Sequence, residues 1–176
     1  MEWHHTTSPT RKKFKSSPSV GKVMASVFWD EKGVILLDFW EQGNTVNADR
    51  YIETLKKLRG HLRRLYPFKD QRTALLLHDN ATPHTAKRTI DTIAEFGWTL
   101  LPHPRYSPDL APSDFHLFGP LKEDLRGHHF EDTETLKRAV RQWFRKKDTN
   151  FYRAGIHALV RRWTKTVTNN GDYIEK

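Results

Sequence analysis

Residues 73–84 read TALLLHDNATPH, and this stretch decides the fold. The run from Thr73 to His78 is short and nearly all apolar, as is typical of a β-strand packed on both faces. Thr82 and Pro83 then open a helix that we predict to run to about Phe96, because proline is tolerated in a first helical turn. Asp79 lies between the two elements. Open α/β sheets bind ligands outside the carboxyl ends of their strands, so Asp79 is a candidate site residue. Its simpler role would be to cap the helix.

The flanking segments predict a mixed sheet covered by helices. Upstream, residues 22–29 (KVMASVFW) and 34–40 (VILLDFW) favour β-structure around a turn at 30–33, which predicts a hairpin. Downstream, a short strand at 98–101 completes a parallel crossover unit. Helices are predicted over residues 48–65 (capped by Asn47), 114–126, 133–146 (capped by Thr133) and 150–168, so the C-terminal third is helical.

Asp114 is the second candidate acid. It follows the stretch from Pro102 to Pro112, where four prolines in eleven residues enforce a stiff loop. Thirty-four residues (80–113) separate Asp79 from Asp114, enough for a helix, a strand and a loop to return the chain to one edge of the sheet. Two facing carboxylates repel unless a cation lies between them. Oxygen ligands in a chain without cysteine favour Mg²⁺ or Mn²⁺. Asp114 too has a simpler role, as a helix cap.

The charge of the chain points to nucleic acid. Thirty Lys and Arg residues against twenty-one Asp and Glu residues give a formal net charge of +9. Basic residues that cluster neutralise phosphates better than scattered ones. Clusters occur at residues 56–64 and 138–162 as well as near the start, where the candidate DNA-binding residues are Arg11, Lys12, Lys13, Lys15 and Lys22. The alternative is that the charge serves solubility alone.

Length and composition limit the architecture. A chain of 176 residues suits one domain, and we assign residues 1–20 to a basic arm and 21–176 to that domain. No apolar run is long enough to cross a membrane and the start lacks the apolar core of a signal peptide, so we expect a soluble, non-secreted protein. No cysteine is present, which excludes thiolate metal sites and disulfides. No motif for a small-molecule cofactor stands out.

Three segments carry a resemblance to a known family. HDNATPHTA (78–86), the aspartate 34 residues later in YSPDLAPSDFHLF (106–118), and FYRAGIHALVRRWTKTVTNNGDYI (151–174) together resemble the mariner transposases. The chain is also similar to the transposase portion of a SET-domain fusion protein in which the last acid is asparagine; Asp114 keeps the transposase form here.

The resemblance implies an RNase H-like catalytic domain that hydrolyses and joins DNA strands with two metal ions, acting as a homodimer in the nucleus. It makes Asp79 the second catalytic acid and Asp114 the third. The family's first acid lies in a TGDE-like first strand that has no match here, so we expect a truncated domain with that strand missing. Asp30 is a turn residue and not its substitute. The helix-turn-helix modules that precede the family's catalytic domain have no match either.

Several alternatives stay open from sequence. The chain is either an impaired transposase catalytic domain or a non-catalytic remnant that binds DNA or dimerises. The missing strand leaves a gap that the arm fills, that the hairpin closes by pairing with the strand at 73–78, or that stays unsatisfied. His78 and His84 are interpreted as structural hydrogen-bonding groups, not ligands, and Asn80 either positions the site or does not.

Overall fold

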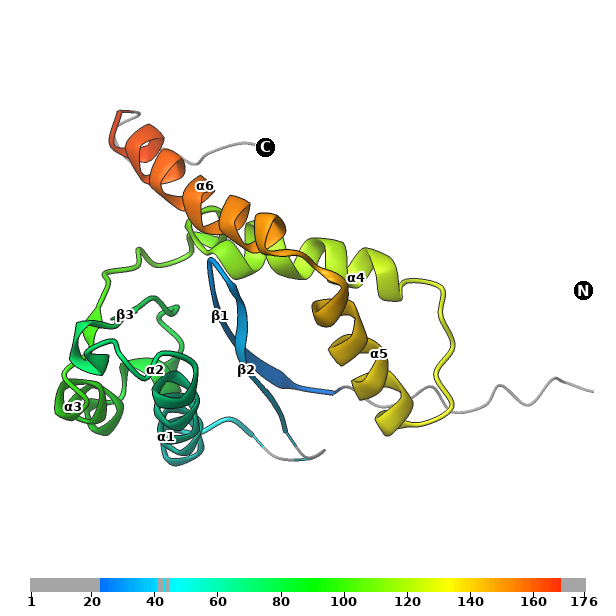
Figure 1. The fold of residues 1–176 in the computed structure, drawn as a ribbon, viewed down its shortest axis with the longest axis horizontal. Helices are drawn as coiled ribbons and strands as arrows, with labels where there is room; N and C mark the ends of the chain where they lie inside the picture. Colours follow the sequence, from blue (N-terminus) through cyan, green and yellow to red (C-terminus); the bar gives the residue numbers. More distant parts are fainter. Residues whose placement is uncertain (1–22, 41–42, 44, 169–176) are drawn as a thin grey trace, which may run out of the picture.

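The computed structural model describes residues 23–40, 43 and 45–168 (Figure 1). The predicted arm and the residues Arg11, Lys12, Lys13, Lys15 and Lys22 lie outside the described residues. The strands are β1 (Ala25–Asp30), β2 (Gly33–Phe39), β3 (Leu75–Leu76) and β4 (Thr99–Leu100). The helices are α1 (Ala48–Leu65), α2 (Thr82–Thr85), α3 (Lys87–Glu95), α4 (Gly119–Leu125), α5 (Thr133–Lys146) and α6 (Thr149–Thr168), with a π-helix at Ser113–Phe118 and 3-10 turns at Gln71–Thr73 and Pro108–Leu110.

The predicted hairpin is confirmed. β1 and β2 pair antiparallel from Ala25 opposite Phe39 to Asp30 opposite Gly33. The Asp30 carboxylate accepts hydrogen bonds from the backbone N–H groups of Lys32 and Gly33 and from the Tyr66 hydroxyl. Two of these donors belong to the turn itself, where aspartate is favoured, and the third is on the residue that follows α1. Asp30 therefore acts as a turn residue, and it is not among the residues that line the cavities beside Asp79.

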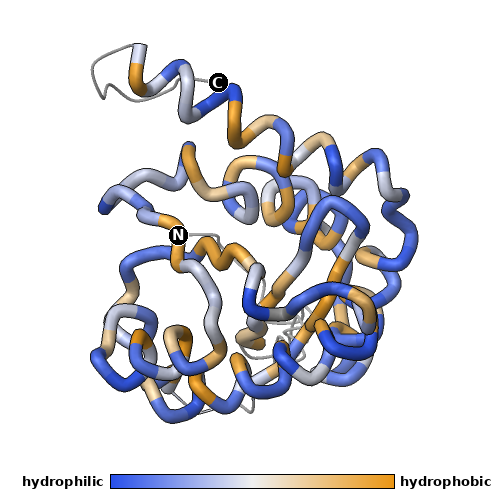
Figure 2. Tube along the Cα trace, turned by 60° about the vertical axis from the view of Figure 1, so that its left-hand side comes forward, coloured by the Kyte–Doolittle hydropathy of each residue, from blue (hydrophilic) through white to orange (hydrophobic). Residues whose placement is uncertain are grey.

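Two hydrophobic cores lie on opposite faces of the hairpin, which Figure 1 shows between α1 and α3 on one side and α4, α5 and α6 on the other. Successive side chains of a strand point to opposite faces, so Phe28 joins one core while Val27 and Trp29 join the other. Apolar segments gather toward the interior of the trace and hydrophilic ones along the outer helices (Figure 2). The first core contains Leu36, Tyr51, Leu55, Leu58, Leu76, Ile93, Phe96 and Trp98; the second contains Leu117, Leu121, Trp143, Phe144 and Tyr152.

The parallel crossover unit forms, with two corrections. β3 and β4 pair in parallel, Leu75 with Thr99 and Leu76 with Leu100. The expectation that this strand is packed on both faces is wrong, because Leu76 is buried but Leu75 is 67% exposed.

The single helix predicted from Thr82 is also broken, because Ala86 has extended backbone angles (φ −57°, ψ 137°) between α2 and α3. Gly97 ends the unit's helical part at φ +74°, as a C-terminal glycine does.

The sheet is in two pieces. The hairpin does not pair with β3 in the described part of the chain; each pair of strands forms its own two-stranded sheet. A cavity of about 320 Å³ separates them, with Ala25–Phe28 on one wall and Leu77–Asp79 on the other. The alternative in which the hairpin closes the gap is therefore wrong. The arm, which was the other candidate for filling it, lies outside the described residues.

The C-terminal third is helical, as predicted. α5 has the predicted bounds, but its cap is Asp132 and not Thr133: the Asp132 carboxylate accepts from the backbone N–H of Thr135 at 2.6 Å. Aspartate one residue earlier places its oxygen over the free N–H groups of the first turn. The helix predicted over 114–126 is split into the π-helix and α4. Within the described ranges, no helix is both long and apolar enough to span a membrane.

Candidate active site

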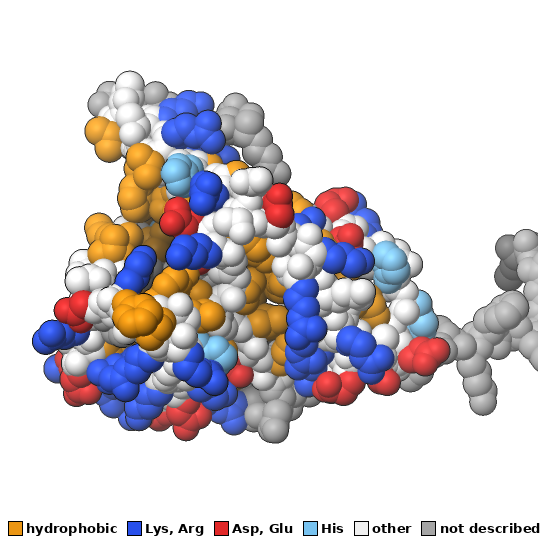
Figure 3. Space-filling view, viewed as in Figure 1, with side chains coloured by type: hydrophobic (Ala, Val, Ile, Leu, Met, Phe, Trp, Pro, Cys, Tyr) orange, Lys and Arg blue, Asp and Glu red, His pale blue; other side chains and the backbone are white. Residues whose placement is uncertain are grey.

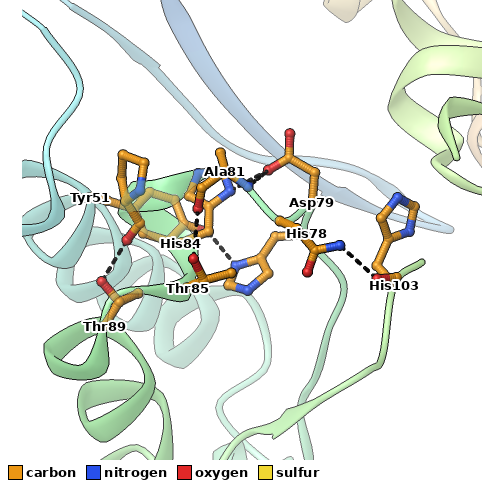
Figure 4. Close-up of polar contacts among 10 residues, drawn as sticks. Tyr51, His78, Asp79, Ala81, His84, Thr85, Thr89 and His103 are labelled. Atoms are coloured by element: carbon orange, nitrogen blue, oxygen red, sulfur yellow. Dashed lines mark hydrogen bonds and ion pairs between the residues drawn. The ribbon is translucent and has the colours of Figure 1, made fainter. Parts of the chain in front are cut away.

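Asp79 is fixed by its own turn. One carboxylate oxygen, Oδ1, accepts hydrogen bonds from the backbone N–H of Ala81 at 3.1 Å and from His84 Nδ1 at 2.6 Å (Figure 4). Burial acts to raise the pKa of Asp79, but the hydrogen bond from Ala81 and the contact with His84 outweigh it and hold the pKa below its usual value. The carboxylate is 60% exposed and ionised at neutral pH. It both closes the turn before α2 and faces solvent.

A stack of aromatic rings lies behind Asp79. The His84 ring lies parallel to the His78 ring, with centroids 5.0 Å apart, and 4.0 Å from the ring of the buried Tyr51. Burial, and then the neighbouring His84, lower the pKa of His78 to about 4, so this ring is neutral at pH 7. Burial also raises the pKa of Tyr51, whose hydroxyl shares a hydrogen bond with His78 Nδ1 at 2.9 Å. The prediction that the two histidines form structural hydrogen bonds is confirmed.

Asp114 stands on the π-helix, whose position is set by contacts on both sides. Trp29 of β1 donates through Nε1 to the hydroxyl of Ser113 at 3.1 Å. His116 donates through Nε2 to the backbone carbonyl of Phe151 at 2.8 Å, and Leu117 has no exposed area. The hairpin and α6 therefore hold the turn that carries Asp114. π-helical turns of this kind often occur at functional sites.

The two acids face one cavity. Asp79 and Asp114 both line an open cavity of about 500 Å³ beside the proline-rich loop, and both also line the cavity between the two sheets. Burial, and then the charge of Asp79, raise the pKa of Asp114. The charge of Asp79 therefore acts on the Asp114 carboxylate. The structure brings together the two acids that the sequence predicts, whereas their roles as catalytic metal ligands stay predictions.

The proline-rich loop contributes a residue that the sequence reasoning missed. Asn80 donates from its side-chain amide to the backbone carbonyl of His103 at 2.7 Å, which ties the end of β3 to the loop. His103 lines both cavities, and its buried Nδ1 has no hydrogen-bond partner among the described residues. Farther along, Tyr106 has φ +57°, an uncommon backbone angle for a residue with a side chain. In the sequence, the prolines around His103 were the one feature that marked this loop as a fixed element near the site.

The donor set suits a small divalent cation but is incomplete. Carboxylate oxygens are the ligands that Mg²⁺ and Mn²⁺ prefer, and a cation between Asp79 and Asp114 would relieve their repulsion. The two hydrogen bonds that Asp79 accepts from Ala81 and His84 both end on Oδ1, which leaves Oδ2 available to bind a cation. Among the described residues, no group of three or more Asp, Glu, His or Cys side chains could hold a metal ion. The pair therefore fits the metal as part of a ligand set.

Several residues of the basic clusters have partners within the chain. Arg59 lies over the ring of Phe96, with 4.5 Å between guanidinium and ring centroid. Arg162 lies 4.2 Å from the centroid of Phe115 and donates to the carbonyl of Asp109 at 3.2 Å, which holds the proline-rich loop against α6. Other basic residues, among them Arg63 and Arg64, are exposed. Lys and Arg side chains spread over both halves of the face in Figure 3, mixed with acidic ones.

Comparisons with known proteins assign the chain to a family. A family model described as transposase (partial DDE domain) matches residues 1–72. The Mariner Mos1 transposase of Drosophila mauritiana is 40% identical over 188 aligned residues, which cover 99% of this chain and 54% of that protein. A solved structure of the Mos1 transposase catalytic domain with raltegravir and Mg is 43% identical, has a TM-score of 0.82, and aligns over 87% of this chain and 77% of that one. The chain belongs to the mariner transposase family.

The match also settles the fold, because the mariner catalytic domain is RNase H-like. The histone-lysine N-methyltransferase SETMAR of Homo sapiens is 36% identical over 155 aligned residues, 88% of this chain and 23% of that protein. The Mos1 paired-end complex with the left transposon end is 39% identical with a TM-score of 0.84, over 99% of this chain and 51% of that one. The chain thus spans about half the length of the Drosophila mariner transposase (54%).

Proposed function

We propose that this chain is the catalytic domain of a DNA transposase, which hydrolyses phosphodiester bonds and transfers strands with the help of Mg²⁺ or Mn²⁺. The observation that carries the proposal is the shared cavity of Asp79 and Asp114, in a chain 43% identical to the Mos1 catalytic domain solved with Mg and with Mn. The match to a catalytic domain favours this function over a non-catalytic remnant.

The two acids have separate parts in this function. Asp79 offers its free Oδ2 from the turn after β3, and Asp114 offers its carboxylate from the π-helix across the cavity. A pair of divalent ions, when bound, activates an attacking oxygen and stabilises a leaving oxygen. Two carboxylates are fewer than the three that the family resemblance implies, so we propose that the described part of the chain works slowly by itself.

DNA is the proposed substrate and partner. The Mos1 transposase has been solved in a complex with a transposon end, and the net charge of +9 favours a polyanion. We propose that Arg11, Lys12, Lys13, Lys15 and Lys22 contact phosphates, that the protein acts in the nucleus where its substrate lies, and that it forms a homodimer. Size-exclusion chromatography with light scattering tests the dimer. A dimer would have about twice the chain mass of 20.8 kDa, whereas a measured mass of 20.8 kDa would contradict it.

Nicking of supercoiled plasmid tests the activity. We expect slow nicking that requires Mg²⁺ or Mn²⁺ and is lost in Asp79→Ala and in Asp114→Ala. The matched control is Asp91→Ala, which removes an exposed aspartate that pairs with Lys87 on the surface of α3 and should nick like the wild type. Nicking that persists in both site variants would refute the assigned roles.

DNA binding is tested separately, by fluorescence anisotropy at several salt concentrations. Contacts to phosphates release counterions, so the logarithm of the affinity should fall linearly with the logarithm of the salt concentration. A protein that does not bind DNA at low salt would refute the proposed substrate.

A further inference from the structure

His84 is the group outside the acid pair that most directly controls its geometry. Its Nδ1 lies 2.6 Å from Asp79 Oδ1, and the His84 side chain is only 21% exposed whereas Asp79 is 60% exposed. An ionised carboxylate only accepts hydrogen bonds, so the proton of this bond belongs to Nδ1. Together with the backbone N–H of Ala81, His84 engages Oδ1, so Oδ2 is the oxygen left to bind a cation in the cavity that Asp79 lines.

The ring of His84 is itself fixed by the first core. Tyr51, 2% exposed on α1, lies against one side with ring centroids 4.0 Å apart, and His78 stacks at 5.0 Å. The backbone of His84 is held too, because its N–H donates to the carbonyl of Ala81 at 2.8 Å. One turn on, the fully buried Thr89 donates from its hydroxyl to the carbonyl of Pro83 at 2.7 Å and anchors α2 to α3 (Figure 4).

A chain of contacts therefore runs from the buried Tyr51 through His84 to an oxygen of Asp79. A carboxylate on a surface turn rotates freely about its side-chain bonds unless something holds it, and ligands held by a supporting group bind metal more tightly. We propose that His84 is a positioning residue for the metal site: its Nδ1–H fixes the plane of the Asp79 carboxylate and aims Oδ2 at the cation shared with Asp114. This inference rests on the proposed metal-dependent function.

Two substitutions separate the hydrogen bond from the ring packing. His84→Asn keeps an N–H donor near the position of Nδ1 but removes the ring. His84→Phe keeps a ring against Tyr51 and His78 but removes the donor. Supporting groups of metal ligands typically contribute about 10–100-fold to affinity. We expect His84→Phe to weaken Mn²⁺ binding by about 10-fold or more, and His84→Asn to stay within about threefold of the wild type.

Mn²⁺ binding to the full chain, followed by electron paramagnetic resonance of the free ion, is the first measurement. The opposite pattern, with tight binding by His84→Phe and weak binding by His84→Asn, would show that the ring packs and does not position, and overturns the proposal. Equal binding by both variants and the wild type overturns it as well. A wild type that binds Mn²⁺ no better than Asp114→Asn overturns the proposed function instead, and the His84 inference falls with it.

Nuclear magnetic resonance of the imidazole nitrogens gives a readout independent of metal. In the wild type without metal, long-range ¹H–¹⁵N correlations should show a proton on Nδ1 of His84, and its resonance should shift in Asp79→Ala. His84→Phe supplies the assignment, because the signal disappears. A ring that carries its only proton on Nε2 would contradict the hydrogen bond on which the positioning role depends.

Discussion

Replacing Gly155 with alanine tests how tightly α6 holds the turn that carries Asp114. Gly155 is buried in α6. A Cβ at this position would lie 2.5 Å from Cδ2 of His116 and 2.8 Å from Cη2 of Trp29. Both distances are below those that real Cβ atoms show, so a neighbour must move. The π-helix therefore packs against a position in α6 where any side chain would displace its neighbours.

His116 has little room to move. Its Nε2 donates to the carbonyl of Phe151 at 2.8 Å, and its ring lies 4.4 Å from the ring of Phe151 and 6.4 Å from that of Trp29. Moving the ring far enough to admit a methyl group stretches this hydrogen bond. Trp29 is held as well, because it donates to Ser113.

The free energy of unfolding should fall by roughly 1–3 kcal/mol. Overpacking a filled core costs about 1–3 kcal/mol, and weakening the bond from His116 to Phe151 costs about 1 kcal/mol more. Alanine in place of glycine inside a helix returns about 1 kcal/mol. For a chain of this size, each kcal/mol lowers the melting temperature by about 2–4 °C, so we expect a decrease of about 5 °C.

Thermal unfolding followed by circular dichroism measures the change, and Gly60→Ala is the matched control. Gly60 lies inside α1, exposed, and a Cβ there would meet nothing within 4 Å. This variant should gain about 0.5–1 kcal/mol from helix propensity alone. The reasoning is refuted if Gly155→Ala melts at or above the wild-type temperature while Gly60→Ala shows the expected gain.

Three further substitutions have definite expected outcomes. Leu117→Ala removes a side chain with no exposed area from the second core and should lower the free energy of unfolding by about 2–5 kcal/mol in urea titrations. Asn47→Ala removes the side-chain oxygen that accepts from Arg50 N at 3.0 Å, so the same titration should show a loss of about 1 kcal/mol that Asn47→Asp largely avoids. Phe68→Ser changes a fully exposed ring, so the free energy of unfolding of this variant should stay within about 0.5 kcal/mol of the wild-type value. A larger loss would reveal packing that the structure does not show.

Local elements were predictable where local signals decide them. The bounds of α1 and its cap Asn47 agree with the structure, because the apolar spacing and the cap are both encoded within a few residues. The cap of α5 was misplaced by one residue, since Asp132 and Thr133 are both good caps and spacing does not rank them. The exposed face of α6 was not predictable either: Val160 and Val167 are apolar but exposed, because periodicity shows a face and not whether anything covers it.

The pairing of Asp79 with Asp114 was predictable because chain direction alone returns both to one edge. The support around them was not. The stack of Tyr51, His78 and His84 joins α1 to the turn after β3, and residues far apart in sequence give no spacing signal. The same holds for His103, whose place in the cavity follows from the path of a loop without periodicity.

The placement of the hairpin between two cores has a consequence for the spacing of the acids. Asp79 is supported by the first core and Asp114 by the second, and residues 102–112 connect them on the cavity side. The distance between the carboxylates is therefore governed by the angle between the first and the second core and by the length of the stiff proline-rich loop. Adding one residue to this connector lengthens its reach by about 3.5 Å, whereas a misplacement of about 1 Å can slow a reaction by about 100-fold. Loop length, more than the identity of any side chain in it, is the property that sequence changes in this region must preserve.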